Sequence, residues 1–564
     1  MSQKDKSSVG HVEDIEAIET GEMKKHDATK VMGTVKLTEG SIIYIPTPTA
    51  DPQDPLNLSM LRKVTVLVVI SIFSCLGLAL VSGFGGLLGF YIPQYEEAGV
   101  SYNGITYLMT YPTLFMGIGN LIGMPLAIGV GRRVVMLVST AILAVGAILC
   151  ATAKTYNWHF GARILVGLAA GQSESIVPMI TQEIFFVHER SRALMGQQAI
   201  QVSLTTVWVL FASPIAEAIT PQWWYGLGAV LAGALFVATF FLLPETKYER
   251  SLSAYQEESS SGDEVLTDGF NDNKPNHPEA VPCTERPELD FVNYTPRSFK
   301  SDLRLWNGKP EWFKVWEVLK QTAELLLFPN VLWALLINGL VIGVNIAIGT
   351  TYSTILSAAP YNWPNSSASY INCGQILVAI VALPLLGHGS DWLVKFRANR
   401  NNGLHEPETR LIPLILPAAI GTFTSSLYGE GGAHPYDYHW FVYAWAVAAY
   451  YFCFVGVNIV TITYLLDSYP ARAGPLLVII CAFRGIISFG TSYGTAPFVE
   501  LHGYDGTFNT FAALTGFFAL VGIPIFIWGK RIRAFTGRSF SFCVSLRERV
   551  GLPPESHLSS YISH

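Results

Sequence analysis

Twelve long apolar runs constrain this 564-residue chain more than any other feature. Each run is about 20 residues or longer, which is enough for a helix to cross about 30 Å of hydrocarbon. The sequence therefore predicts an all-α membrane protein with twelve transmembrane helices in two groups of six. The runs occupy residues 64–90, 104–128, 133–153, 158–182, 193–218 and 223–244, and then 325–350, 367–388, 411–429, 440–466, 474–498 and 507–529.

The charged residues support this prediction and orient the helices. They make up 14% of the chain, against roughly 25% in soluble globular proteins. The loops on one side carry nearly all the lysines and arginines, whereas the opposite loops carry essentially Lys154 alone. The positive-inside rule then places both termini and the central polar segment in the cytosol.

The same pattern divides the chain into five segments. Residues 1–62 and 531–564 are expected to be cytosolic tails, the first of them disordered, because they are polar and lack a long apolar run. Residues 63–244 and 323–530 are expected to form two six-helix bundles, joined by a cytosolic linker at 245–322. In that linker Trp312, Val315, Trp316 and Leu319 recur at helical spacing, which indicates either an amphipathic helix at the membrane interface or an extension of the seventh span.

The fourth run carries two charges that hydrocarbon should reject, Arg163 and Glu174. At 100° per residue they share one helix face with Gly167 and Gly171. An ionisable residue deep in a membrane helix costs on the order of 2.5–3.5 kcal/mol even on lenient scales. Either the two charges form a buried structural ion pair or they belong to a proton or solute site. We select Glu174 and Arg163 as the residues expected to couple transport to protons.

Several motifs resemble the major facilitator superfamily of transporters. A six-loop-six arrangement is what two parallel halves would produce. The resemblance spans roughly 55–530, and within the superfamily it is to the fungal twelve-span drug:proton antiporters, a branch that includes polyamine- and histidinol-type permeases. The motifs are Pro125–Arg133, Arg163–Gly171, Phe185–Arg190, Pro244–Arg250, Gly389–Trp392 with Asn401–Leu411, and Tyr464–Pro470 with Arg484.

Two departures from the family pattern stand out. Ile128 and Gly129 replace the acid and the base that the superfamily loop carries, so Asp391 is expected to supply the equivalent acid in the second half. The fifth span ends with Ala212-Ser213-Pro214, whereas the antiporters have the pattern Gly-Pro-x-x-Gly-Gly there. This difference leaves the direction of transport open.

Polar residues on several spans predict a wet cavity between the halves. Glu174 and Arg484 both lie about halfway along their spans and are expected to face one cavity. The amides on the other spans either line that cavity or bond helices together at about 0.6 kcal/mol each. The predicted cavity residues are Glu174, Gln198, Gln201, Asn338, Asn345, Asn372, Gln375, Tyr451, Asn458 and Arg484.

Charges at the cytosolic span ends form a second predicted group. The resemblance implies that they make salt bridges that open and close as the halves rock, although isolated arginines also anchor helices at the interface. This predicted gate consists of Arg132, Arg133, Glu183, Glu189, Arg190, Asp391, Arg410 and Asp467. Of the three glycosylation sequons, Asn365 alone is expected on the outer side.

These features predict a secondary active transporter, proton-coupled and monomeric, in the plasma membrane or, alternatively, the vacuolar membrane. Its solute would be an organic cation, a drug or a specialised metabolite, with export favoured. The alternatives are a proton-coupled importer of polyamine-like or other nutrients, and a transporter-like nutrient receptor. The sequence has no nucleotide-binding P-loop and no metalloprotease motif, so we expect no enzyme activity, cofactor, metal or nucleic-acid partner.

Overall fold

The computed structural model describes residues 35–36, 49–248, 290–291, 294–305, 310–400, 404–469 and 472–549. Most of the predicted N-terminal tail, residues 550–564 and the acidic part of the linker therefore lie outside the described residues. Within some described helices the side chains are also outside the description, and these include Arg190 and Asp391.

The first half consists of helices that match the first six apolar runs. Two of the spans are bent: α3 continues into α4 through Gly83, and α7 continues into α8 through Gly171. The helices are α3 (Met60–Ser82), α4 (Phe84–Glu96), α5 (Tyr102–Gly129), α6 (Arg132–Ala151), α7 (Tyr156–Ala170), α8 (Gln172–Ile184), α9 (Val187–Leu210), α10 (Ala212–Ala218) and α11 (Pro221–Leu242).

The second half repeats this architecture. Its elements are α14 (Pro329–Ser357), the 3₁₀ segment η3 (Asn365–Asn372), α15 (Cys373–Arg400), the 3₁₀ segment η4 (Pro407–Leu414), α16 (Ile415–Ala433), α17 (Trp440–Ser468) and α18 (Ala473–Arg549). The predicted start of the eighth span at 367 is wrong by about six residues, because η3 occupies the first part of that run.

The count of membrane crossings agrees with the prediction. Among the described residues, ten helical segments are long and apolar enough to span a bilayer, and the last of them, Gly474–Thr536, has 63 residues. Gly503 reverses the chain inside that segment at φ 75°, a conformation that glycine adopts without steric cost. This last segment therefore crosses the membrane twice, once before and once after Gly503. With the nine other segments and the 28-residue α15, the described residues make twelve crossings.

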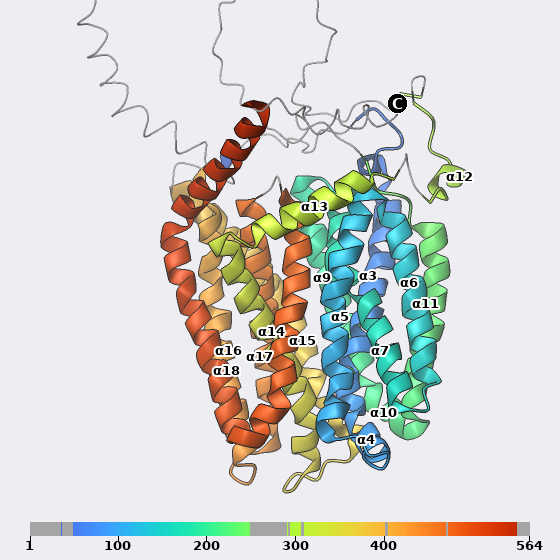
Figure 1. Ribbon diagram of the computed structural model, residues 1–564, viewed down its shortest axis with the longest axis vertical. Coiled ribbons are helices and arrows are strands. Elements are labelled where there is room, and N and C mark those ends of the chain that lie inside the picture. The colour runs from blue at the N-terminus through green and yellow to red at the C-terminus, as the bar shows by residue number, and fades with distance from the viewer. Residues whose placement is uncertain are drawn as a thin grey trace, which may run out of the picture.

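The linker lies across one end of the molecule, which we name the linker end (Figure 1). It contains α12 (Phe299–Asp302) and α13 (Trp312–Leu325). α13 is a separate helix and not an extension of α14, because the chain leaves α13 at Leu326 and α14 starts at Pro329. α3 begins and α18 ends at this same end, and the opposite end carries α4, α10 and η3 (Figure 1).

One short sheet also forms at the linker end. β1 (Val35–Lys36) pairs antiparallel with β2 (Leu404–His405), with Val35 opposite His405. This contact brings the N-terminal segment to the loop that follows α15.

Local sequence signals set several helix ends. The Ser101 side chain accepts a hydrogen bond from the Gly104 amide at the start of α5, and Thr155 does the same for Trp158 in α7. Both are N-cap contacts that satisfy amides lacking a partner within the helix. Pro221 and Pro329 occupy the first turns of α11 and α14, where a missing N–H costs nothing.

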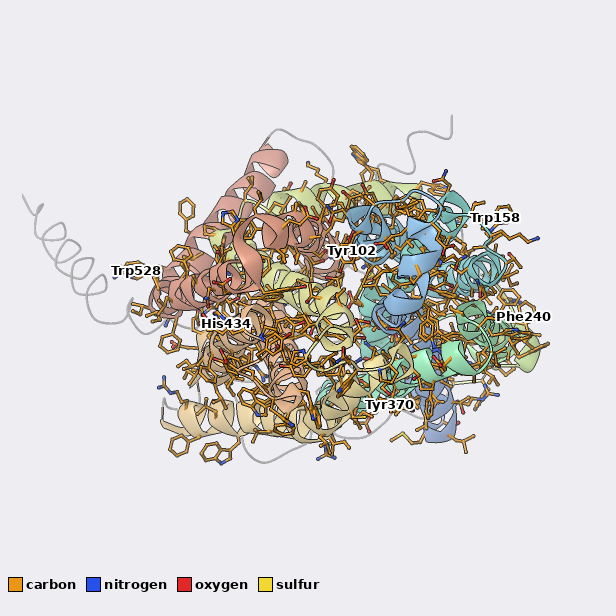
Figure 2. All side chains as sticks on the ribbon, turned by 90° about the horizontal axis from the view of Figure 1, so that it is seen from below. Tyr102, Trp158, Phe240, Tyr370, His434 and Trp528 are labelled. Atoms are coloured by element: carbon orange, nitrogen blue, oxygen red, sulfur yellow. The ribbon has the colours of Figure 1, made fainter. Side chains whose placement is uncertain are left out.

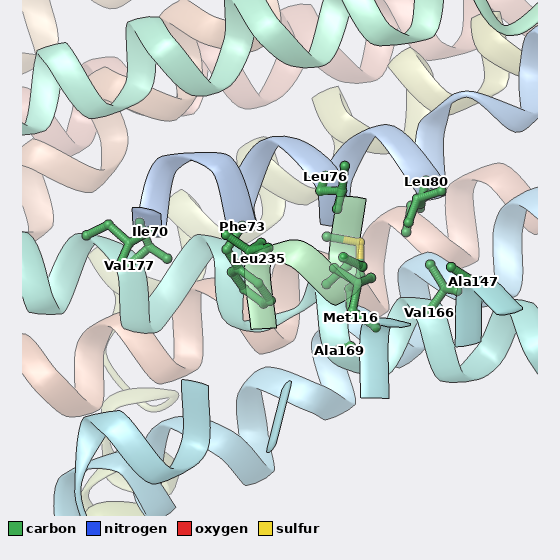
Figure 3. Packing of buried hydrophobic residues seen from close by; sticks show 14 of the residues in the cluster. Ile70, Phe73, Leu76, Leu80, Met116, Ala147, Val166, Ala169, Val177 and Leu235 are labelled. Atoms are coloured by element: carbon green, nitrogen blue, oxygen red, sulfur yellow. The ribbon is translucent and has the colours of Figure 1, made fainter. Parts of the chain in front are cut away.

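Each half has its own apolar core. The first joins residues of α3–α11, including Phe73, Val166 and Leu235 (Figure 3), and the second joins residues of α14–α18. Small residues allow close helix contacts in the first core: a Cβ on Gly167 would come within 2.4 Å of the Pro112 carbonyl oxygen. Helices in a membrane associate largely through such tight packing, so α7 is held firmly against α5.

Candidate functional site

The two halves are joined at mid-depth by an ion pair between Glu174 and Arg484. Glu174 lies in α8 of the first half, and Arg484 lies in α18 of the second half. The Arg484 side chain is 4% exposed and the Glu174 side chain 19%. A charge pair that is nearly removed from solvent interacts far more strongly than one on a surface. The contact therefore joins the two halves through a nearly buried pair of opposite charges.

Asn458 of α17 completes this site from a third helix. Its Oδ1 accepts a hydrogen bond of 3.2 Å from Nη1 of Arg484. On the same face of α18, the Cys481 thiol donates to the Glu174 carbonyl oxygen at 3.2 Å. Glu174, Asn458 and Arg484, all predicted cavity residues, are thus brought together.

The backbones of the two halves also approach closely near this site. A Cβ on Gly117 of α5 would lie 2.6 Å from the carbonyl oxygen of Ala482, and one on Gly485 would lie 2.9 Å from the Gly117 nitrogen. A side chain at either position would push α5 and α18 apart. The sequence analysis missed this Gly–Gly contact because neither glycine belongs to a motif.

The remaining predicted cavity residues are divided among several places. Asn338 is buried inside the second half and donates to Thr461 Oγ1 at 2.7 Å, which matches the helix-bonding alternative. The Gln375 amide donates to Asn372 Oδ1 at 3.0 Å, near the opposite end. Gln201 accepts from Gln197 at 2.7 Å on its own helix. Gln198, Asn345 and Tyr451 are half-buried.

Arg163 is placed away from Glu174, about 16 Å along the helix axis at 1.5 Å per residue. Its guanidinium is fully buried and donates to the carbonyls of Leu108, Leu80 and Val81 at 2.9, 2.6 and 2.9 Å. It also donates to the Tyr225 hydroxyl at 3.2 Å.

The chain itself explains why these carbonyls are available. Pro112 has no N–H to donate to Leu108, four residues earlier in α5. Leu80 and Val81 lie in the last turn of α3, before the bend at Gly83, where helix carbonyls need outside donors. Arg163 therefore satisfies two helix irregularities at once.

A network of charges closes the linker end of the first half. Arg132, at the start of α6, forms an ion pair of 2.6 Å with Glu183, at the end of α8. The other Glu183 oxygen accepts from the Thr246 hydroxyl at 2.7 Å. Glu245 accepts from the backbone amides of Arg132, Thr246 and Lys247 at 2.9–3.0 Å. Burial raises the pKa of the Glu245 carboxyl above its ordinary value.

Two more basic residues tie the linker to this network. Arg133 is buried and donates to the carbonyls of Asp302, Arg304 and Phe240. Lys247 donates to the Gly129 carbonyl at 2.8 Å and pairs with Glu311, beside α13, at 3.4 Å. Arg133, which was predicted to be a gate residue, therefore anchors the segment around α12.

The second half has a related arrangement. Arg410 in η4 pairs with Asp467, at the end of α17, at 2.6 Å. This pair occupies the position that Arg132 and Glu183 occupy in the first half. Next to it, Arg533 contacts both carboxylate oxygens of Glu408 at 2.9 and 2.7 Å, with the two side chains 0% and 6% exposed.

The sequence analysis missed Glu245, Glu408 and Arg533 as site residues, although the first two lie in stretches that carry the family resemblance. Of the other predicted gate residues, Glu189 is half-buried and the side chains of Arg190 and Asp391 lie outside the described residues.

The halves also meet at the opposite end. Ser369 of η3 donates to the Leu210 carbonyl at 2.7 Å, and Asn365 Nδ2 donates to the Gly89 carbonyl at 3.2 Å. The Tyr107 and Tyr493 rings stack across the boundary with centroids 5.0 Å apart. The Asn365 amide nitrogen therefore faces Gly89 in this structure, and its glycosylation stays a prediction.

These features define a class of protein: a membrane protein of two six-helix bundles that meet around a buried charge pair. A family model, the Major Facilitator Superfamily, matches residues 74–474. The chain belongs to this superfamily.

Individual proteins agree with this assignment. The chain is 24% identical to Protein HOL1 of Saccharomyces cerevisiae, over 92% of this chain and 94% of that one. It is 22% identical to Multidrug transporter TPO1_1 of Candida glabrata, over 86% and 78%. The solved structure of the nucleoside transporter NupG has the same fold, with a TM-score of 0.52 at 12% sequence identity. The alignment covers 82% of this chain and 100% of the NupG chain.

Proposed function

We propose that this chain is a proton-coupled secondary transporter of a small organic solute and that it works by alternating access between its two halves. The observation that carries the proposal is the Glu174–Arg484 ion pair, because it joins the halves within the membrane-spanning region. Protonation of Glu174 would remove one partner of this pair. The halves would then separate more easily at mid-depth, so proton binding and conformational change are linked.

The solute is an organic cation, a drug or a specialised metabolite. Glu174 is 19% exposed and so remains partly accessible within the boundary. A cationic solute would compete with Arg484 and with a proton for the same carboxylate. Binding of the solute would therefore favour release of the proton, which couples solute and proton transport in opposite directions. This competition favours export in exchange for protons. The relative TPO1_1 is named a multidrug transporter, which supports a drug as the solute.

The proposal is tested with purified protein reconstituted into liposomes under an imposed pH gradient. An acidic interior that drives solute uptake indicates exchange, and an acidic exterior that drives it indicates import together with protons. Glu174→Gln should abolish the response to the gradient, while the control Glu217→Gln, at an exposed carboxylate of the opposite end, should retain it. Full coupled transport by Glu174→Gln would disprove the role of this carboxylate, and absence of flux across a broad solute panel would favour a receptor.

A further inference from the structure

A pocket of about 240 Å³ lies at the opposite end, on the boundary between the halves. α5 of the first half contributes Tyr102 and Thr106, α14 contributes threonines that include Thr350, and α18 contributes Thr495, Glu500 and Tyr504. Figure 2, which views this end, labels Tyr102 near the middle of the face, between the two bundles. The volume is below the 300–1,000 Å³ typical of sites for drug-sized ligands, so the pocket suits a smaller molecule.

The pocket is distinct from the Glu174–Arg484 site. Thr495 lies eleven residues beyond Arg484 in α18, about 16 Å along the axis at 1.5 Å per residue. The stacked rings of Tyr107 and Tyr493 lie at intermediate positions on α5 and α18. Two contacts between the halves flank the pocket: the Tyr102 and Thr354 hydroxyls are 3.3 Å apart, and Asn103 Nδ2 donates to Glu500 Oε1 at 3.3 Å.

Several threonine hydroxyls that line the pocket donate their protons to carbonyls of their own helices, which leaves their oxygens free to accept hydrogen bonds from a ligand. Thr106 donates its proton to the Asn103 carbonyl at 2.8 Å, Thr350 to the Ala347 carbonyl at 2.8 Å, and Thr495 to the Thr491 carbonyl at 3.0 Å. A hydroxyl whose proton is already engaged offers lone pairs to a ligand. Together with the Glu500 carboxylate, this lining favours a ligand that donates hydrogen bonds or carries positive charge, and the two tyrosine rings offer faces for cation–π contact.

The charges around the pocket act in the same direction. The described residues of the opposite end carry seven carboxylates, and Lys154 is the lysine or arginine among them. A surface lined by one sign of charge raises the local concentration of the opposite ion. The carboxylates are those of Glu96, Glu97, Glu217, Glu430, Asp437, Glu500 and Asp505.

We propose that this pocket is a second binding site, separate from the Glu174 site, for a small organic ammonium ion, with Glu500 as its counter-ion. Its walls come from both halves, so an occupied pocket holds the opposite end closed. The site does not depend on proton coupling at Glu174, because it is defined by equilibrium binding and not by flux.

The test is equilibrium binding of choline to the full-length protein in nanodiscs, with the neutral isostere 3,3-dimethylbutan-1-ol as the matched ligand. Choline should bind and the alcohol should not. Glu500→Gln should weaken choline binding about two- to fivefold, since it removes a charged partner at an exposed position. Glu500→Asp should restore most of the affinity, and Glu97→Gln, at an exposed carboxylate of the same end that does not line the pocket, should leave it unchanged.

Three outcomes would overturn the proposal. They are equal binding of choline and the alcohol, equal effects of Glu500→Gln and Glu97→Gln, and loss of choline binding in Glu174→Gln with none in Glu500→Gln. Size-exclusion profiles of each variant establish that it is folded. Failure of the proton-driven flux alone would disprove the proposed function and leave this site intact.

Discussion

Arg163 and Arg484 are both buried arginines in membrane-spanning helices, but their partners differ in kind. Arg484 pairs with a carboxylate of the other half, so its contact changes with protonation and with movement of the halves. Arg163 donates to carbonyls of its own half, which neither titrate nor move between halves. We therefore expect Arg163, selected from the sequence as a coupling residue, to stabilise the first bundle.

The substitution Arg163→Met tests this expectation. It would leave the carbonyls of Leu80, Val81 and Leu108 without donors in an apolar environment, at about 1–3 kcal/mol for each unsatisfied group. We expect a loss on the order of 3 kcal/mol or more, measured as a lower thermal unfolding midpoint of the detergent-purified protein. Arg192→Met, at an exposed position, is the control. An unchanged midpoint together with abolished proton coupling would contradict the structural role and support the coupling role that the sequence predicted for Arg163.

At the scale of single elements, α13 has an apolar surface that the other described residues leave uncovered. Val318 and Leu325 pack inward at 7% and 0% exposure, whereas Trp312, Phe313 and Trp316 are 65%, 53% and 69% exposed. Tryptophan concentrates where hydrocarbon meets headgroups, and α13 lies across the ends of the spans (Figure 1). We expect these aromatic side chains to contact lipid.

Quenching by brominated lipid measures this contact. In nanodiscs containing such lipids, the double substitution Trp312→Phe with Trp316→Phe should reduce the quenchable fraction of tryptophan fluorescence. Trp333→Phe is the matched control, because Trp333 is buried at 3% exposure and should contribute little quenchable signal. If the double substitution leaves the quenchable fraction unchanged, the aromatic face of α13 does not lie in the bilayer.

The sequence predicted the helices well but their irregularities less well. Apolar length determines a span, so the crossings could be counted directly. The predicted start of α15 was wrong because the end of η3, Asn365–Asn372, was included in the apolar run, whereas it forms a separate 3₁₀ segment. Sequence periodicity cannot tell a 3₁₀ segment such as η3 from the first turns of a span. The conformation of η3 depends on contacts with Gly89 and Leu210 in the other half, which are distant in the sequence.

The candidate site was predictable where depth alone decided it. Glu174 and Arg484 were each expected near the midplane, and the structure pairs them. The partners of Arg163 could not be read from its own helix, because they depend on Pro112 in α5 and on the bend after α3. The threonine-lined pocket was missed for a similar reason: its threonines come from three helices and form no local pattern.

At the scale of the whole molecule, the contacts differ with depth. Ion pairs at the linker end lie mostly within each half, as Arg132–Glu183 and Arg410–Asp467 illustrate. At mid-depth and at the opposite end, polar and aromatic contacts cross the boundary. Alternating access by movement of one half against the other requires the contacts at the opposite end to break in each cycle.

Cross-linking of the opposite end tests this requirement. Tyr107 and Tyr493 stack across the boundary, so cysteines at these positions, in a background whose native cysteines are replaced, should be joined by a short bis-methanethiosulfonate cross-linker that forms a disulfide with each of them. The cross-linked protein should lose solute flux in liposomes, because the halves can no longer separate there, and a reductant that cleaves the linker should restore the flux. The matched control is a cysteine pair at Tyr361 and Tyr443, whose rings lie 5.5 Å apart within the second half and whose cross-link should leave flux intact. Undiminished flux through a fully cross-linked Tyr107–Tyr493 pair would mean that solute crosses without separation of this end, and rocking of the two halves would not be the transport motion.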